Sequence, residues 1–315
     1  MSAIGLYMPE WLCKSEPSDR LFLDDLAVTL RAGGCEVILI DLERPLPECP
    51  TNLVAVVQHH SPFFSTSLAY AQNIQFLQSR VRLFNSPAAQ AVGYNKALTQ
   101  KYLRLQGLPV LDSYEIRAKA DFYALKEDTL HVIKPIDRGA GEGVKLVKRE
   151  GQAMLQHHRG NWLPVIVEEV TEGLRVRPCV YNLPFFLREP AFTYAPMLVE
   201  PFFNNGVEEF ASLRCTVIGD EVVESVRRVN SHDITSNVSR GGTATATTLT
   251  PIQRDMAIAA SCAIGADYSG VDLLIKGEET VIGEVNIGPI TIFTAYTGVR
   301  VGQLFGKYIL TELTK

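Results

Sequence analysis

The chain has 315 residues, of which 46% are hydrophobic and 21% are charged, and its mean hydropathy is +0.07. This composition is typical of a folded globular protein and excludes disordered, collagen-like and low-complexity chains. The net charge of −5 argues against nucleic acid held by overall charge, and no apolar run approaches the roughly 18 residues of a membrane helix, so neither partner is expected.

The first hundred residues alternate predicted strands with predicted helices. Strands are predicted at residues 3–7, 37–40 and 53–57, the last two continuously buried, and helices from a Ser18 cap to Gly33, at 68–78 and at 96–106. This alternation predicts a parallel sheet covered on both faces, a doubly wound α/β unit. Ligands of such sheets bind beyond the carboxyl ends of the strands, where the loop at 58–62 falls; it fits a surface turn and a substrate contact equally well.

After Gly107 the pattern changes to mostly strands. Short strands are predicted at 131–135, 144–147, 165–168 and 198–202, followed by a hairpin around Gly219. A later helix has Thr250 as its cap and Pro251 at its first position, and two further strands are joined by a turn at 276–279. The second half of the chain is therefore expected to be α+β.

A glycine-rich loop follows one of these strands. Lys134 ends the strand, and Gly139, Gly141 and Gly143 alternate between it and the next. Without Cβ atoms, such a loop can bring backbone amides close to phosphate oxygens. The spacing is neither the dinucleotide-binding fingerprint nor a P-loop, and on its own the loop fits a tight hairpin better than a phosphate cradle.

Three oxygen-bearing side chains are predicted to share one face of a hairpin. Asp272 lies on its first strand, and Glu284 and Asn286, two residues apart, lie on its second. Carboxylates and an amide flanked by apolar residues are costly unless they bind a cation, and oxygen ligands select Mg²⁺ or Mn²⁺. The alternative is a strand pair with acids on a solvated face.

A cluster of arginines, polar residues and glycines lies in the sequence between the glycine loop and the hairpin that carries Asp272 and Glu284. The members of this cluster are Arg214, Arg227, Arg228, Asp233, Asn237, Arg240, Gly241 and Gly242. Guanidinium groups match phosphate and carboxylate oxygens, although such a run also fits a solvated loop. Together with the glycine loop and the oxygen face, the cluster favours a site for a nucleoside triphosphate.

In their order, these motifs resemble the ATP-grasp superfamily, most closely its RimK-type ligases, with glutathione synthetase as a more distant relative. The resemblance runs from Phe84 to Gly302, roughly two thirds of the chain. The matching segments are 95–96, 132–134, 139–144, 198–202, 213–223, 227–228, 236–242, 249–251, 270–274, 284–286 and 297–298.

The resemblance implies an ATP-grasp fold of the α/β and α+β class. Residues 1–107 would form an N-terminal doubly wound parallel-sheet domain. Residues 108–203 would form a central lid lobe with the glycine loop, and residues 204–315 a C-terminal lobe with the metal site. The two α+β lobes would clasp ATP between them.

The resemblance also implies roles for single residues. Lys96 and Lys134 would be the nucleotide lysines, and Gly139, Gly141 and Gly143 the lid over the phosphates. The adenine would be held by the hinge Glu200, Pro201 and Phe202, and two Mg²⁺ ions, or Mn²⁺, by Asp272, Glu284 and Asn286. Phosphates, the transferred group and the acceptor carboxylate would be met by Arg214, Arg228, Asn237 and Arg240.

The chain departs from the family pattern at three places. Ser212 replaces the usual aspartate before Arg214, and the turn after Asn286 reads Ile-Gly-Pro-Ile instead of x-Ser-Pro-Gly. Residues 171–196 have no counterpart in shorter relatives, and an alternative alignment moves the hinge to 165–170, with Glu168 and Glu169.

The implied activity is that of an ATP-dependent carboxylate–amine ligase, which forms an amide or peptide bond through an acyl phosphate. Its substrates would be a small-molecule or peptide carboxylate, such as an amino acid or peptide, and an amine. Two alternatives are a small-molecule phosphotransferase on the same scaffold and a non-catalytic nucleotide-binding module. A homo-oligomer, dimer or tetramer, is the family expectation.

A cytoplasmic location is expected from two further features. The first residues, Met-Ser-Ala-Ile, lack the basic region of a signal peptide. The six cysteines are scattered without a Cys-x-x-Cys pair, which predicts small buried side chains in a reducing compartment.

Overall fold

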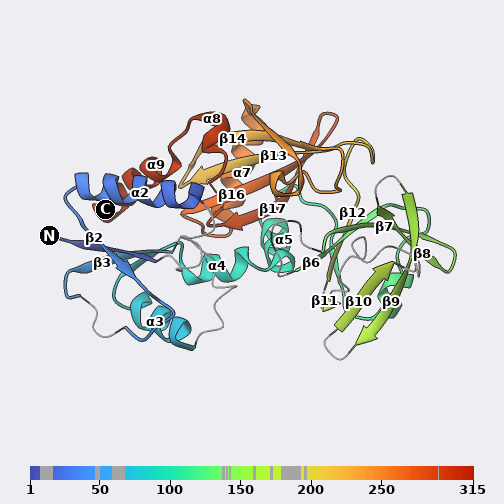
Figure 1. The fold of residues 1–315 in the computed structure, drawn as a ribbon, viewed down its shortest axis with the longest axis horizontal. Coiled ribbons are helices and arrows are strands. Elements are labelled where there is room, and N and C mark those ends of the chain that lie inside the picture. Colours follow the sequence, from blue (N-terminus) through green and yellow to red (C-terminus); the bar gives the residue numbers. More distant parts are fainter. Residues whose placement is uncertain are drawn as a thin grey trace.

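The computed structural model describes residues 1–7, 17–46, 50–58, 68–136, 139, 141, 143–158, 161–170, 173–178, 193–194, 197–289 and 291–315. Three sheets organise this part of the chain. In Figure 1 the N-terminal sheet and the central sheet lie at opposite ends of the molecule, and the C-terminal sheet lies between them along the long axis. None of the helices described is long and apolar enough to cross a membrane.

The N-terminal sheet is parallel, with the strand order β2-β1-β3-β4. Its strands are β1 (Ala3–Tyr7), β2 (Glu36–Ile40), β3 (Leu53–Gln58) and β4 (Arg82–Phe84). Helices α2 (Pro17–Ala32) and α3 (Leu68–Gln78) cover opposite faces, since Leu26 packs with Ile4 while Leu77 packs with Ala3. The doubly wound arrangement predicted for this unit is confirmed.

Two local predictions in this unit are wrong. Ser18 lies inside α2, and its buried hydroxyl has no partner among the residues described, so it is not the helix cap. Strand β2 was expected to be buried, but it is an edge strand whose Leu39 is 83% exposed. The apolar run that predicts burial cannot distinguish a central strand from an edge strand. Of the loop at 58–62, only Gln58 lies within the described residues.

The central sheet has the order β11-β10-β9-β8-β7-β6-β12-β5. Its strands are β5 (Tyr114–Ile116), β6 (His131–Pro135), β7 (Lys145–Glu150), β8 (Ala153–His158), β9 (Asn161–Val170), β10 (Gly173–Pro178), β11 (Thr193–Tyr194) and β12 (Met197–Pro201). Helix α6 (Lys119–Tyr123) inserts Phe122 into a core with Ile133 and Val199. The strands predicted here are confirmed, although β9 is longer than expected. Only 173–178 and 193–194 of the extra segment 171–196 lie in the described residues.

The C-terminal sheet is antiparallel, with the order β15-β14-β13-β16-β17. Its strands are β13 (Phe210–Ile218), β14 (Glu221–Asn230), β15 (Thr243–Ala246), β16 (Tyr268–Lys276) and β17 (Glu279–Ile287). The predicted cap is confirmed, because Thr250 Oγ1 accepts a hydrogen bond of 3.2 Å from Gln253 N at the start of α7 (Pro251–Ala263). Helix α7 covers one face of this sheet and leaves the other for the site.

Some helices pack against a unit other than the one that they adjoin in the sequence. Helices α4 (Pro87–Gly93) and α5 (Lys96–Leu105) pack against β17, with Val92 and Leu103 in the core of the C-terminal sheet. Helix α9 (Val301–Leu313) lies along α2, as Figure 1 shows. A Cβ at Gly302 would lie 2.2 Å from Phe22 O, so glycine permits this close approach. The division into domains at 1–107, 108–203 and 204–315 therefore stays a prediction.

Three cysteines lie in the described part of the chain. Cys215 is buried, Cys35 is half-buried and Cys262 is exposed, and all three are free thiols. The expectation of buried cysteines is therefore wrong for Cys262, whose position on the outer surface of α7 follows from the helical period. The remaining three cysteines lie outside the described residues.

Candidate active site

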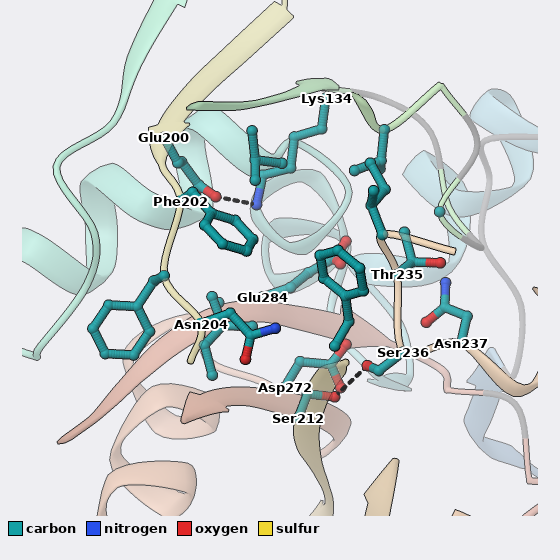
Figure 2. A pocket seen from close by; sticks show the side chains of 18 of the residues that line it. Lys134, Glu200, Phe202, Asn204, Ser212, Thr235, Ser236, Asn237, Asp272 and Glu284 are labelled. Carbon is teal, nitrogen blue, oxygen red and sulfur yellow. Dashed lines mark hydrogen bonds and ion pairs between the residues drawn. The ribbon is translucent and has the colours of Figure 1, made fainter. Parts of the chain in front are cut away.

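A pocket of about 950 Å³, its open mouth included, lies between the central and C-terminal sheets. Figure 2 shows Lys134 and Glu200 on one wall and Ser212, Asp272 and Glu284 on the other. Most of the predicted site residues line it: Lys96, Lys134, Gly139, Gly141, Glu200, Pro201, Phe202, Arg228, Asn237, Asp272 and Glu284. Four predicted residues are not among its lining: Gly143, Arg214, Arg240 and Asn286.

Lys134 and Glu200 form a buried ion pair on the central sheet. They lie on the neighbouring strands β6 and β12, and Lys134 Nζ is 2.7 Å from Glu200 Oε2. Burial lowers the pKa of Lys134, but the carboxylates of Glu200, Glu284 and Asp272 outweigh burial and raise this pKa above its ordinary value, so the amine stays charged. The other carboxylate oxygen, Glu200 Oε1, is buried and has no hydrogen-bond partner among the described residues.

Lys96 reaches the same pocket from the start of α5. Asn95 caps this helix by accepting a hydrogen bond of 2.9 Å from Leu98 N, and the Lys96 backbone amide donates to Ile136 O just after β6. Lys96 Nζ is 2.9 Å from Glu284 Oε1. Burial raises the pKa of Glu284, but Lys96 and then Lys134 outweigh it and hold that pKa below its ordinary value. Glu284 is therefore an ionised carboxylate at neutral pH.

Two arginines share one carboxylate at the centre of the site. Arg214 Nη1 and Arg228 Nη2 each lie 2.9 Å from Asp272 Oδ1. Arg228 is only 4% exposed, and burial lowers its pKa although Asp272 counteracts this. Two guanidinium charges against one carboxylate leave a local excess of positive charge.

Ser212 holds Arg228 in place. Its Oγ accepts hydrogen bonds of 2.8 Å from Arg228 Nη2 and 3.2 Å from Arg228 Nε, and lies 2.6 Å from Ser236 Oγ (Figure 2). The hydroxyl of Ser236 is the third hydrogen-bond partner of Ser212. A hydroxyl at position 212 thus orients the arginine without neutralising it.

Asp272, Glu284 and Asn286 lie on one hairpin, as predicted. Asp272 faces Glu284 across β16 and β17, and Asn286 follows on the same side, with its Nδ2 3.5 Å from Gly270 O. No three His, Cys, Asp or Glu side chains within the described ranges gather as a metal set. The candidate set is two carboxylates and an amide, an all-oxygen chemistry that fits Mg²⁺ or Mn²⁺.

The glycine loop approaches the segment with Asn237 and Arg240, which lies between strands β14 and β15 of the C-terminal sheet. Gly141 has a φ of +72°, and a Cβ there would lie 2.9 Å from Asn237 Nδ2 and 3.1 Å from Arg240 Nε. Arg240, in the short 3₁₀ helix η3 (Val238–Arg240), is 3.4 Å from Asp233 through its Nη1. Glycine is therefore required at position 141 by both the backbone conformation and the close approach.

The apolar part of the pocket contains residues that the sequence analysis did not select. Phe202 and Phe210 meet edge to face with ring centroids 5.9 Å apart. The pocket is also lined by residues for which no role was predicted, among them apolar Leu111, Val132, Phe203 and Leu274 and polar Asn204, Thr235 and Ser236. The alternation of Phe210, Ser212 and Arg214 along β13 is the signal that could have found Phe210, because such residues share one face. This apolar slot fits a flat ring.

The hinge position follows from strand order. Strand β12, which carries Glu200 and Pro201, borders the pocket directly. Strand β9, where the alternative hinge at 165–170 falls, is separated from β12 by β8, β7 and β6. The order favours Glu200–Phe202. In the altered turn after Asn286, Ile290 lies outside the described residues.

Sequence comparisons match part of the chain to known proteins. A family model described as a RimK-like ATP-grasp domain matches residues 187–308. Ribosomal protein bS6–L-glutamate ligases of Salmonella paratyphi B and Salmonella newport are 42% identical over 78 residues, which is 24% of this chain. The matched segment spans only 26% of the length of these relatives.

Solved structures match over nearly the whole chain. The ATP-grasp ligase PsnB complexed with minimal precursor has a TM-score of 0.63 at 18% identity, covering 100% of this chain and 99% of that one. D-alanine–D-alanine ligase from Bacillus anthracis has a TM-score of 0.61 at 13% identity, covering 100% of this chain and 98% of that one. A RimK domain ATP-grasp protein from Sphaerobacter thermophilus scores 0.61 at 16% identity and covers 98% and 99%. The chain therefore has the ATP-grasp fold, and its residues 187–308 match the family model of a RimK-like ATP-grasp domain.

Proposed function

We propose that this protein is an ATP-dependent ligase that joins a carboxylate to an amine through an acyl phosphate. The observation that carries the proposal is a single pocket combining an apolar slot, two lysines and an ionised oxygen face beside two arginines. The similar proteins support it, since they include a bS6–L-glutamate ligase and a D-alanine–D-alanine ligase.

In this proposal the adenine of ATP occupies the slot beside Phe202 and Phe210. The backbone of Pro201 and Phe202 would hold the base edge, and the unpartnered Glu200 Oε1 would accept a hydrogen bond from the adenine amino group. Guanine presents a carbonyl at the corresponding position, so the same oxygen would disfavour GTP. Lys96 and Lys134 would meet the phosphates.

Asp272, Glu284 and Asn286 would hold Mg²⁺, as one or two ions, with Mn²⁺ also suited to the set. When bound, the metal supplies positive charge against the phosphate oxygens. The carboxylates are held in place by Lys96, Arg214 and Arg228. These cations can turn from the carboxylates to the phosphates of the nucleotide.

Charge explains the chemistry proposed for the arginines. A substrate carboxylate that approaches the γ-phosphate meets like charge, at a cost of about 4 kcal/mol per unit pair at 4 Å and an effective dielectric constant of 20. Arg214 and Arg228 would offset this repulsion. The carboxylate oxygen bonds to the γ-phosphorus as the bond to ADP breaks. The amine nitrogen then attacks the carbonyl carbon, loses a proton and expels phosphate.

Asn237 and Arg240 would act where the glycine loop meets the C-terminal sheet. Gly139, Gly141 and Gly143 would cover the phosphates, and an added Cβ at Gly141 would lie only 2.9 Å from Asn237 Nδ2 and 3.1 Å from Arg240 Nε. Such a lid would exclude water from the acyl phosphate. Asn237 would contact the transferred phosphoryl group, and Arg240 the acceptor carboxylate.

The test is ADP release with a panel of amino acids, dipeptides and γ-glutamyl compounds, with mass spectrometry of the products. We expect ADP and phosphate only when an acid and an amine are both present, and a product with the mass of their amide. A stable phosphorylated product would identify a phosphotransferase instead, and nucleotide binding without turnover a binding module. A cytoplasmic homo-oligomer, dimer or tetramer, stays a prediction that fractionation and light scattering would test.

A further inference from the structure

A second buried carboxylate lies on the same sheet face as the candidate metal residues. Glu224 pairs in register with Thr216, which pairs with Gly270, which pairs with Asn286. Two residues further along these strands, Arg214, Asp272 and Glu284 are paired with one another in the same way. Glu224 is only 5% exposed, and neither the sequence motifs nor the pocket include it. A glutamate in this position needs a reason, because burying an acid is costly.

Both carboxylate oxygens of Glu224 are occupied by threonine hydroxyls. Thr216 Oγ1 donates to Oε2 at 3.1 Å from the neighbouring strand, and Thr297 Oγ1 donates to Oε1 at 2.6 Å from α8 (Thr294–Thr297). Figure 1 shows α8 close to β14. Glu224 therefore fastens a segment outside the sheet to the sheet itself.

The segment that Glu224 holds through Thr297 is residues 291–299. It begins shortly after β17, the strand that carries Glu284 and Asn286. Thr297 Oγ1 also accepts from Val299 N at 3.2 Å and lies 3.1 Å from Phe293 O. Just before the segment, Pro289 packs against Gly270, where an added Cβ would lie 2.8 Å from Pro289 and 3.0 Å from Arg214 Nη1. Pro289, which precedes the segment, and the Arg214 guanidinium therefore both lie against Gly270.

The charges around Glu224 favour an ionisation that burial opposes. Burial raises the pKa of Glu224, and the Thr297 and Thr216 hydrogen bonds and the Arg214 charge counteract it only in part. Of the other groups near this cluster, Tyr268 on β16 is neutral, because burial and then Glu224 and Asp19 raise its pKa far above its ordinary value. Arg214 is thus the cation that faces Glu224.

We propose that Glu224 is a positioning residue of the ligase, which fixes residues 291–299 through Thr297 and sets the charge around Arg214 on the side where the second substrate enters. The proposal rests on the proposed function, because it assigns Arg214 to the phosphate. If the phosphates lie at Asp272, Arg214 connects them to this part of the chain, because Arg214 contacts Asp272 and, like Pro289, lies against Gly270.

Protonation changes how the segment is held. When Glu224 is ionised, the single Thr297 hydroxyl proton goes to Glu224 Oε1. When Glu224 is protonated, it can donate to Thr297 Oγ1, and the threonine proton turns to Phe293 O. Both arrangements keep the contact, so charge and attachment can be separated by substitution: Glu224→Gln keeps the bonds without the charge, and Glu224→Ala removes both.

The first test measures amide hydrogen exchange at Val299 by NMR. We expect at least tenfold faster exchange in Glu224→Ala and near wild-type exchange in Glu224→Gln. Glu221→Gln, on the exposed part of the same strand, is the matched control and should leave Val299 unchanged. Wild-type exchange in a folded Glu224→Ala variant would overturn the attachment. Thr297→Val removes the acceptor of Val299 N itself and gives the exchange rate for a completely lost contact.

The second test measures the affinity for Mg·AMPPNP at about pH 4, below the ordinary glutamate pKa that burial raises in Glu224, and at about pH 8. We expect Glu224→Gln and wild type to bind equally at the lower pH and Glu224→Gln to bind at least threefold more tightly at the higher pH, because an ionised Glu224 counteracts Arg214. Glu221→Gln should follow wild type. If the ratio of the Glu224→Gln affinity to the wild-type affinity did not change with pH, the proposed effect of the Glu224 charge would be overturned. If wild type bound no nucleotide, the proposed function would fail, whereas the Val299 measurement would still decide the attachment.

Discussion

Arg214 and Arg228 both contact the same oxygen of Asp272, each at 2.9 Å. The two guanidinium groups come from the neighbouring strands β13 and β14, and the carboxylate comes from β16 on the other side of β13. Removing the carboxylate leaves two partly or fully buried cations without their shared partner. Asp272 therefore has a structural role that is separable from metal binding.

Asp272→Asn should destabilise the protein by about 3 kcal/mol, because uncompensated buried charges cost roughly that much. Urea unfolding at neutral pH measures this loss. Asp255→Asn on the exposed surface of α7, where the side chain is 74% exposed, is the control and should change little. An Asp272→Asn variant as stable as wild type would show that the arginines find other partners.

Lys134→Met should weaken Mg·AMPPNP binding at least tenfold and also destabilise the fold, since Glu200 would lose its partner 2.7 Å away. The double variant Lys134→Met with Glu200→Gln should recover much of the stability but none of the nucleotide affinity. Calorimetric titration and thermal unfolding separate the two effects. Restored binding in the double variant would contradict the assignment of Lys134 to the phosphates.

Acid should destabilise the wild type partly through Glu284. Because Lys96 and Lys134 hold the pKa of Glu284 below its ordinary value, its stabilising effect is complete above the unfolded pKa of about 4.3 and is lost as pH falls through the folded pKa. Glu284→Gln should therefore be less stable than wild type at pH 7, with the difference narrowing below about pH 4. Urea unfolding over this range checks the sign, and a constant difference would contradict it.

Gly141→Ala should reduce ADP release more than tenfold with little loss of global stability. The new Cβ would lie 2.9 Å from Asn237 Nδ2, at a residue that lines the pocket without belonging to a core. Gly107→Ala is the matched control: Gly107 has a similar φ of +70°, but nothing lies within 4 Å of its added Cβ. Equal losses of activity in the two variants would attribute the effect to backbone strain instead of to the contact with Asn237.

Strand alternation made much of the site predictable. The spacing of Asp272, Glu284 and Asn286 requires only that a hairpin pairs in register, which is a local property. Lys134 was found beside the glycine loop and Glu200 through the resemblance, but their ion pair was not predicted. Strand β12 returns beside β6 only after a long excursion through β7 to β11. No local pattern encodes that return.

Helix packing was less predictable than helix formation. The apolar stripe of α5 predicts that one face is buried, but it does not say against which sheet, and Leu103 packs with β17 instead of with the parallel sheet. Glu224 was missed because a single acid in the run Val-Val-Glu-Ser-Val is typical of an exposed strand position. Its significance depends on Thr297, 73 residues away in the sequence.

The packing of α9 on α2 has a consequence for synthesis on the ribosome. The apolar face of α2, with Phe22 and Leu26, is covered by Val301, Phe305 and Ile309 of α9. Because α9 is translated long after α2, the N-terminal unit emerges with this face open and must wait for almost the whole chain before it is buried. Nascent chains stalled before α9 should therefore bind chaperones that recognise apolar segments. The chaperones should dissociate from the chain once α9 has left the exit tunnel.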